Sequence, residues 1–79
     1  MDAMTARETI IRPKLTAVFG AALTNSLLTA AIAAGMGGKT EPEKLALMVK
    51  SVLGDPKVLG MWGKAQVDKQ MKEWLALVS

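Results

Sequence analysis

The sequence contains no cysteine, no histidine and no tyrosine, and aromatic residues make up only 4% of its 79 residues. Without cysteine the chain has no disulfide framework, no thiolate metal site and no thiol nucleophile. Without histidine it lacks the commonest general base and the commonest metal ligand, so its serines have no imidazole to activate them. We therefore expect no catalytic residue, no metal site and no cofactor site, and we interpret the chain as a non-enzyme.

Charge is a weaker guide to function. Ten Lys and Arg residues against seven Asp and Glu residues give a net charge of +3, which is basic but far from the density of a nucleic-acid-binding arm. We expect no secretory signal, because Asp2 and Glu8 lie among the basic residues near the start. These features do not determine the cellular compartment. An assembled particle or filament is the preferred location, and a membrane is the alternative.

Apolar side chains are abundant for a chain of this size. Hydrophobic residues make up 51% of the sequence, mostly Ala, Leu, Val and Met. A single domain of residues 1–79 would bury only about 60% of the surface that its unfolded chain exposes. The pattern therefore predicts further burial outside the chain, in copies of itself or in a membrane.

The first half predicts one long helix over about residues 5–35. Thr5 and Glu8 have the spacing of a capping box, and Pro13 predicts a kink near residues 10–13. Residues 15–38 carry no charge, and Gly20 is the only weak helix former inside the helical part. The glycine-rich segment 35–38 predicts a left-handed cap and begins a turn over about residues 35–40.

The second half predicts two helices. Thr40 and Glu43 form a second capping box before a helix over about residues 41–53, and Gly54-Asp55-Pro56 separates it from a helix over about residues 56–78. The apolar face of this last helix rotates between Val58 and Val67, as if it met two different neighbours. No alternating strand pattern is present. The sequence therefore predicts an all-α fold, either a kinked helical hairpin or a three-helix arrangement.

A hairpin folded about Gly37-Gly38 would place Pro13 near Trp62. Gly60 and Gly63 flank this tryptophan, and each costs about 1 kcal/mol of helix stability relative to Ala. Two interpretations stay open: the helix backbones approach each other closely at these glycines, or the glycines interrupt the helix and Met61-Trp62 lies in a loop.

The uncharged helix is apolar on all sides, which is typical of a helix inside a large core or a membrane. Three interpretations are open: a contact between copies, a membrane span, or the central helix of a soluble bundle. A run of this length exceeds the about 20 residues that a membrane span needs. The polar Asn25 lies near its middle, where lipid cannot satisfy its hydrogen bonds. In an assembly, Asn25 would fix the register. The expected assembly or membrane face consists of Val18, Phe19, Leu23, Asn25, Leu27, Leu28 and Ile32.

Two basic groups are candidates for phosphate contacts. Lys50, Lys57 and Lys64 recur every seven residues and would form one positive edge on a continuous helix, while Arg7, Arg12 and Lys14 form a second group. Such groups can neutralise the phosphates of nucleic acid or anionic lipid. Solvated, solubilising charge is the alternative.

Together these features favour a small structural subunit that self-assembles, of the virion coat or filament type, with copies of itself as partners and a lysine edge that contacts nucleic acid. The first alternative is a small single-span membrane protein, holin-like or an accessory subunit of a membrane complex. The second is a soluble adaptor or inhibitor module that binds a partner through an apolar stripe on the helix over residues 41–53, formed by Leu45, Met48, Val49, Val52 and Leu53. We expect no small-molecule substrate.

Overall fold

The structure, a computed structural model that describes residues 1–78, is helical throughout and has no β-strand over those residues. In chain order its elements are α1 (Ala3–Ala6), the π-helical turn η1 (Arg7–Ile11), α2 (Arg12–Gly35), α3 (Glu41–Leu53), α4 (Pro56–Leu75) and the 3-10 turn η2 (Ala76–Val78). The prediction of an all-α fold is confirmed. The predicted bounds of α3 and the start of α4 at Pro56 are also correct.

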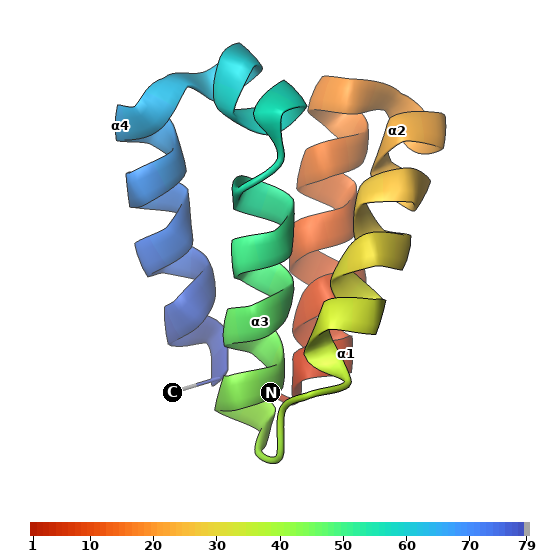
Figure 1. The fold of residues 1–79 in the computed structure, drawn as a ribbon, viewed down its shortest axis with the longest axis vertical. Helices are drawn as coiled ribbons and strands as arrows, with labels where there is room; N and C mark the ends of the chain where they lie inside the picture. The colour runs from red at the N-terminus through yellow and green to blue at the C-terminus, as the bar shows by residue number, and fades with distance from the viewer. Residues whose placement is uncertain (79) are drawn as a thin grey trace.

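Gly20 divides the long first helix. Its backbone angles, φ 82° and ψ 164°, are far from helical and belong to a region that only glycine visits readily. Residues 3–19 form one helical rod, and residues 21–35 return beside it as a second rod (Figure 1). The predicted single helix over residues 5–35 is therefore wrong in this respect, because the uncharged run folds back on itself.

Gly63 breaks α4 in the same way, with φ 80° and ψ 161°. The break explains the rotating apolar face, since Val58 lies before it and Val67 after it, and both are buried. Gly60 is helical, and a Cβ atom built on it would meet nothing within 4 Å. A close backbone approach at Gly60 and Gly63 is thus wrong. The interruption of the helix is correct at Gly63 only, because Gly60, Met61 and Trp62 are helical and form no loop.

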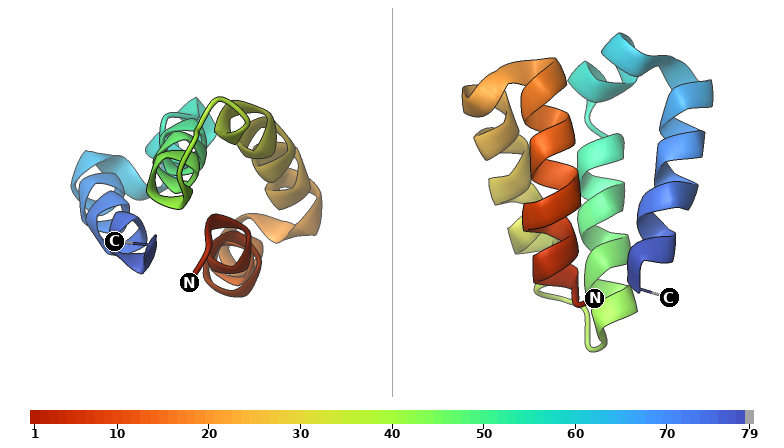
Figure 2. Two further views of the ribbon diagram at one scale, coloured as in Figure 1. Left: turned by 90° about the horizontal axis from the view of Figure 1, so that it is seen from below. Right: turned by 180° about the vertical axis from the view of Figure 1, so that it is seen from behind.

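Four rods run alternately up and down, formed by residues 3–19, 21–35, 41–53 and 64–75 (Figure 1). The end-on view shows them arranged in a curve that brings the first and last rods toward each other (Figure 2). α3 contacts α1, α2, α4 and η2, so it is the helix that the others share. All five residues of the apolar stripe predicted on this helix are buried in the core: Leu45, Met48, Val49, Val52 and Leu53.

Three aromatic side chains pack against one another, and two of them lie beside the glycine breaks. The Phe19 and Trp62 ring centroids are 5.5 Å apart, and those of Trp62 and Trp74 are 6.2 Å apart in an edge-on arrangement. Phe19 and Trp62 each directly precede one of the two glycine breaks. The predicted hairpin register is wrong, since folding about Gly37-Gly38 would place Phe19 opposite residue 56, whereas Phe19 meets Trp62. Trp74 is buried in the core.

The N-terminal caps of the helices are the predicted ones, except at the first helix. Asp2 caps the first helix by accepting a hydrogen bond from the Thr5 N–H at 2.7 Å, so the predicted Thr5 cap is wrong and Glu8 is free for other contacts. The Thr40 hydroxyl accepts from the Glu43 N–H at 3.3 Å, as predicted. Asp55 accepts from the Lys57 N–H at 2.8 Å and caps α4.

Pro13 does not interrupt the helix, and the predicted position of the kink holds a π-helical turn. The backbone at Ile11 and Arg12 stays helical, and the Arg12 N–H donates to the Arg7 carbonyl five residues earlier. This π-helical turn lies directly before the residue that has no N–H to donate. The predicted left-handed glycine cap after residue 35 is also absent, because among residues 1–78 only Gly20 and Gly63 have positive φ. Gly38 is needed for space, since a Cβ there would lie 2.7 Å from the Lys44 nitrogen.

Candidate functional site

The structure divides the seven residues of the predicted assembly or membrane face. Leu27 and Leu28 are in the core, with 4% and 1% of their surface exposed, so in this fold they are not accessible to a second copy. Phe19 and Leu23 are half-buried against that core. The exposed members are Val18, Asn25 and Ile32. The seven residues therefore do not form one surface.

A different stripe of α2 faces outward. Ala22, Ser26, Thr29 and Ala33 are all exposed, and they are separated by four, three and four residues. We call these four residues the outer seam. Alternating steps of four and three keep side chains in one line along a helix, as in the contact seam of a coiled coil. The spacing is visible in the sequence, but only the buried positions between them, such as Thr24 and Leu28, show which side faces out.

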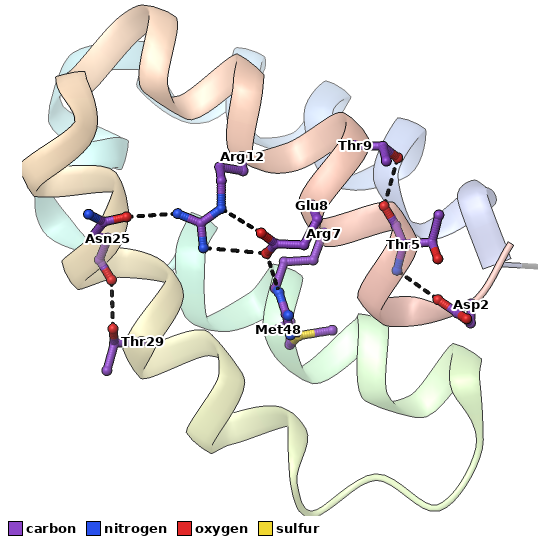
Figure 3. Close-up of polar contacts among 9 residues, drawn as sticks. All are labelled: Asp2, Thr5, Arg7, Glu8, Thr9, Arg12, Asn25, Thr29 and Met48. Carbon is purple, nitrogen blue, oxygen red and sulfur yellow. Dashed lines mark hydrogen bonds and ion pairs between the residues drawn. The ribbon is translucent and has the colours of Figure 1, made fainter.

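Asn25 has a partner within its own chain. Its side-chain oxygen accepts a hydrogen bond from Arg12 Nη1 at 2.7 Å, so it joins the two rods that meet at Gly20 (Figure 3). Arg12 also donates to both carboxylate oxygens of Glu8, at 2.8 and 3.3 Å. Arg7 Nε donates to the same carboxylate at 2.7 Å. The predicted role of Asn25 is to fix the register between copies. In the structure its hydrogen bond joins two rods of one chain instead.

The two basic groups differ from the expected arrangement. A single positive edge through Lys50, Lys57 and Lys64 required one continuous helix, and that expectation is wrong because the helix ends at Leu53 and breaks again at Gly63. Lys64 pairs with Asp68 at 3.2 Å. Arg7 and Arg12 share Glu8. Among residues 1–78, the predicted phosphate contacts without an ion pair are Lys14, Lys50 and Lys57.

A pocket of about 190 Å³ opens where the chain's first turn meets the end of α2 and the start of α3. Its apolar wall consists of Ala3, Met4, Ile32, Gly35, Met36 and Met48, and its polar wall of Arg7, Glu41 and Lys44. Glu41 is engaged on both oxygens, by the Ala3 N–H at 3.1 Å and by Lys44 Nζ at 3.0 Å. Nothing in the sequence pointed to this pocket, because its three segments are distant along the chain.

By length and composition alone, the helical stretch Ala3–Gly35 could cross a membrane. In the folded chain, the break at Gly20 divides this stretch into two rods. Neither rod on its own reaches the about 20 residues that cross the hydrocarbon core. A span would therefore require the helix to straighten at Gly20.

Acid is expected to weaken the fold through three carboxylates whose pKa lies below the ordinary value. Hydrogen bonds from Arg12 and then Arg7 lower the pKa of Glu8, hydrogen bonds from the Ala3 N–H and Lys44 lower that of Glu41, and those from Thr5 lower that of Asp2. Each contributes stability above its ordinary pKa, 4.5 for Glu and 3.8 for Asp, and loses it as the pH falls through the lowered value.

The free energy of unfolding should therefore be level near neutral pH and fall below about pH 4.5. Glu8→Gln should reduce this fall by about 1 kcal/mol or less, since the pair is partly exposed. Urea unfolding between pH 3 and pH 7 measures the effect, with Asp68→Asn as a variant of equal charge change. An equal loss in parent and Glu8→Gln would show that the Glu8 pairs contribute nothing.

Comparison of the chain with protein-family models, with curated proteins and with solved structures found no match.

Proposed function

We propose that this chain is a small structural subunit that self-assembles, of the kind that builds virion coats or filaments, with copies packing through the outer seam. The observation that supports this is an exposed helix face without charge. Residues 15–38 carry no charged side chain, yet half of the rod at residues 21–35 faces outward. A solvent-facing helix surface in a soluble protein is normally charged or strongly polar.

The chemistry of the outer seam suits contact with another helix. Its side chains are small, so a second backbone can approach closely, and their spacing matches a seam between paired helices. The Thr29 hydroxyl already donates to the Asn25 carbonyl at 2.7 Å. Burying the Thr29 hydroxyl at a contact would therefore leave its donor paired, whereas the Ser26 hydroxyl would need an acceptor on the other copy.

The size of the seam favours an array over an isolated dimer. A rod over residues 21–35 is about 22 Å long, and a strip about 10 Å wide along it covers roughly 220 Å². A stable pair buries about 800 Å² on each partner. Each copy would therefore need more than one contact, and Leu59 and Met61, which are 43% and 64% exposed, are apolar side chains available for contacts away from the seam. Contacts between two different surfaces generate rings or filaments.

Ser26→Asp tests the proposal. The parent is expected to sediment as larger species with rising concentration, and the variant, which places carboxylates at the contact, should need at least about tenfold more protein to do so. Ala65→Asp is the matched control, because Ala65 is also small and exposed but lies on α4. Circular dichroism checks that both variants fold.

Analytical ultracentrifugation and electron microscopy provide the readout. A parent that stays monomeric over the whole concentration range would overturn the proposal. Assembly of Ser26→Asp at the parent's concentration would show that the outer seam is not the contact.

The second candidate is a single-span membrane protein, favoured by the length and composition of Ala3–Gly35. Flotation of the parent with vesicles, if it survives high salt, would support this class over self-assembly. The third candidate, an adaptor that binds through the stripe of residues 45–53, loses its proposed surface, because that stripe is buried.

A further inference from the structure

We infer that the pocket beside the first turn binds a small carboxylate with an apolar tail, such as a medium-chain fatty acid, with Arg7 holding the carboxylate. This inference is independent of the assembly proposed above. It rests on the hydrogen bonding of Arg7, on the apolar wall and on the size of the pocket.

Arg7 has donors without adequate acceptors. Its side chain is only 16% exposed, and its Nε donates to Glu8. Among residues 1–78, the one acceptor for its Nη1 is the Met48 sulfur, at 4.0 Å (Figure 3). A thioether sulfur is a weak acceptor. A largely buried guanidinium normally meets a carboxylate through two parallel hydrogen bonds. The donors that line the pocket are therefore suited to an anion from outside the chain.

The charge balance around Arg7 points to the same class of ligand. Glu8 is shared between Arg7 and Arg12, so two guanidinium groups face one carboxylate. The other acid of the pocket, Glu41, is already held by the Ala3 N–H and by Lys44. The charge of Arg7 is therefore only partly neutralised within the chain, and a bound carboxylate would complete its neutralisation.

The rest of the wall favours an apolar tail. Met4, Ile32 and Met36 are 60%, 40% and 80% exposed, an unusual cluster of large apolar side chains in water. Methionine is flexible and polarisable, so it adapts to ligands of irregular shape. The volume of about 190 Å³ exceeds the about 150 Å³ of an apolar cavity that holds benzene. A short alkyl chain therefore fits, with its carboxylate at Arg7.

Titration of the parent chain with octanoate, and separately with octanol, tests the carboxylate. Nuclear magnetic resonance shifts at Arg7, Ile32 and Met36 report binding at the pocket, below the concentration at which octanoate forms micelles. Octanoate is expected to bind at least about tenfold more tightly than octanol, because only octanoate can accept charged hydrogen bonds from Arg7. Equal binding of the two, or no shift at these residues, would overturn the inference.

Arg7→Gln and Lys14→Gln separate the site from general charge attraction, since each removes one positive charge and Lys14 lies outside the pocket. Arg7→Gln should weaken octanoate binding at least about tenfold and leave octanol unchanged, while Lys14→Gln should bind octanoate like the parent. Equal weakening by both variants would contradict a specific role for Arg7. If Arg7→Gln fails to fold, the comparison of octanoate with octanol on the parent still decides.

Discussion

Gly20→Ala is expected to remove most of the stability of the folded bundle. Gly20 has φ 82° and ψ 164°, a conformation that costs a residue with a Cβ about 1–3 kcal/mol. Alanine also favours the straight helix that competes with the reversal, by about 1 kcal/mol over glycine. A domain of this size is stable by only about 3–5 kcal/mol, so the two effects together remove most of its stability.

Gly60→Ala is the matched control for this prediction. Gly60 is helical and a Cβ there would meet nothing within 4 Å, so alanine should raise the free energy of unfolding by about 0.5–1 kcal/mol. Gly63→Ala, only three residues away, should lower it, because Gly63 shares the conformation of Gly20. Opposite changes in the free energy of unfolding at Gly60 and Gly63 cannot arise from a general preference of helices for alanine.

Urea unfolding gives the stabilities, and small-angle scattering gives the shape. The folded chain is 30 Å along its longest axis, whereas one straight helix over residues 3–35 would be about 50 Å long. Gly20→Ala should therefore become longer or aggregate, while Gly60→Ala should keep the parent's dimensions. A Gly20→Ala protein with the parent's stability and size would show that the reversal does not depend on glycine.

The same variant bears on the two leading functions. A helix that is straight through Gly20 is long and apolar enough to span a membrane, whereas the two separate rods are each too short. Gly20→Ala should therefore float with vesicles more strongly than the parent. Strong flotation of the parent itself would instead indicate that the membrane, rather than a second copy, covers the uncharged surface.

Much of the fold is predictable from local signals. Thr40 and Asp55 cap helices where the sequence places them, and the bounds of α3 are correct, because caps and prolines act within a few residues. Gly20 is different, since one glycine in an alanine-rich run costs a helix only about 1 kcal/mol and is compatible with continuity. The reversal depends on burial of Leu15, Leu27 and Leu28 in a shared core, which local propensity does not contain.

The candidate site was less predictable for the same reason. The lysine row failed because it required one continuous helix, and two breaks separate its members. Arg7 and Arg12 are recognisable as basic residues, and their sharing of Glu8 was missed although Glu8 and Arg12 have the i,i+4 spacing of ion pairs on a helix. The pocket requires residues 3–7, 32–36 and 41–48 to meet, which follows from the reversal at Gly20.

Leu27→Asp is expected to unfold the chain, although the neighbouring Ser26→Asp should leave it folded. Leu27 is 4% exposed and belongs to the core, so the variant loses about 1.5–3 kcal/mol of apolar burial and must bury or protonate a carboxylate. Its total cost exceeds about 4 kcal/mol, which is comparable with the stability of the whole domain. Ser26 faces outward in the outer seam, where a carboxylate stays solvated in the single chain.

Circular dichroism and urea unfolding of both variants at low concentration, where the parent is dissociated, separate folding from assembly. We expect lost helicity and no cooperative transition for Leu27→Asp, and a transition close to the parent's for Ser26→Asp. If both variants fold, the rod over residues 21–35 does not pack its Leu27 side inward, and the uncharged helix must be turned differently or lie outside the core. If both unfold, Ser26 is buried in the single chain and the outer seam is no free surface. Opposite outcomes for two adjacent aspartates thus establish which side of α2 holds the fold together and which side is open to a second copy.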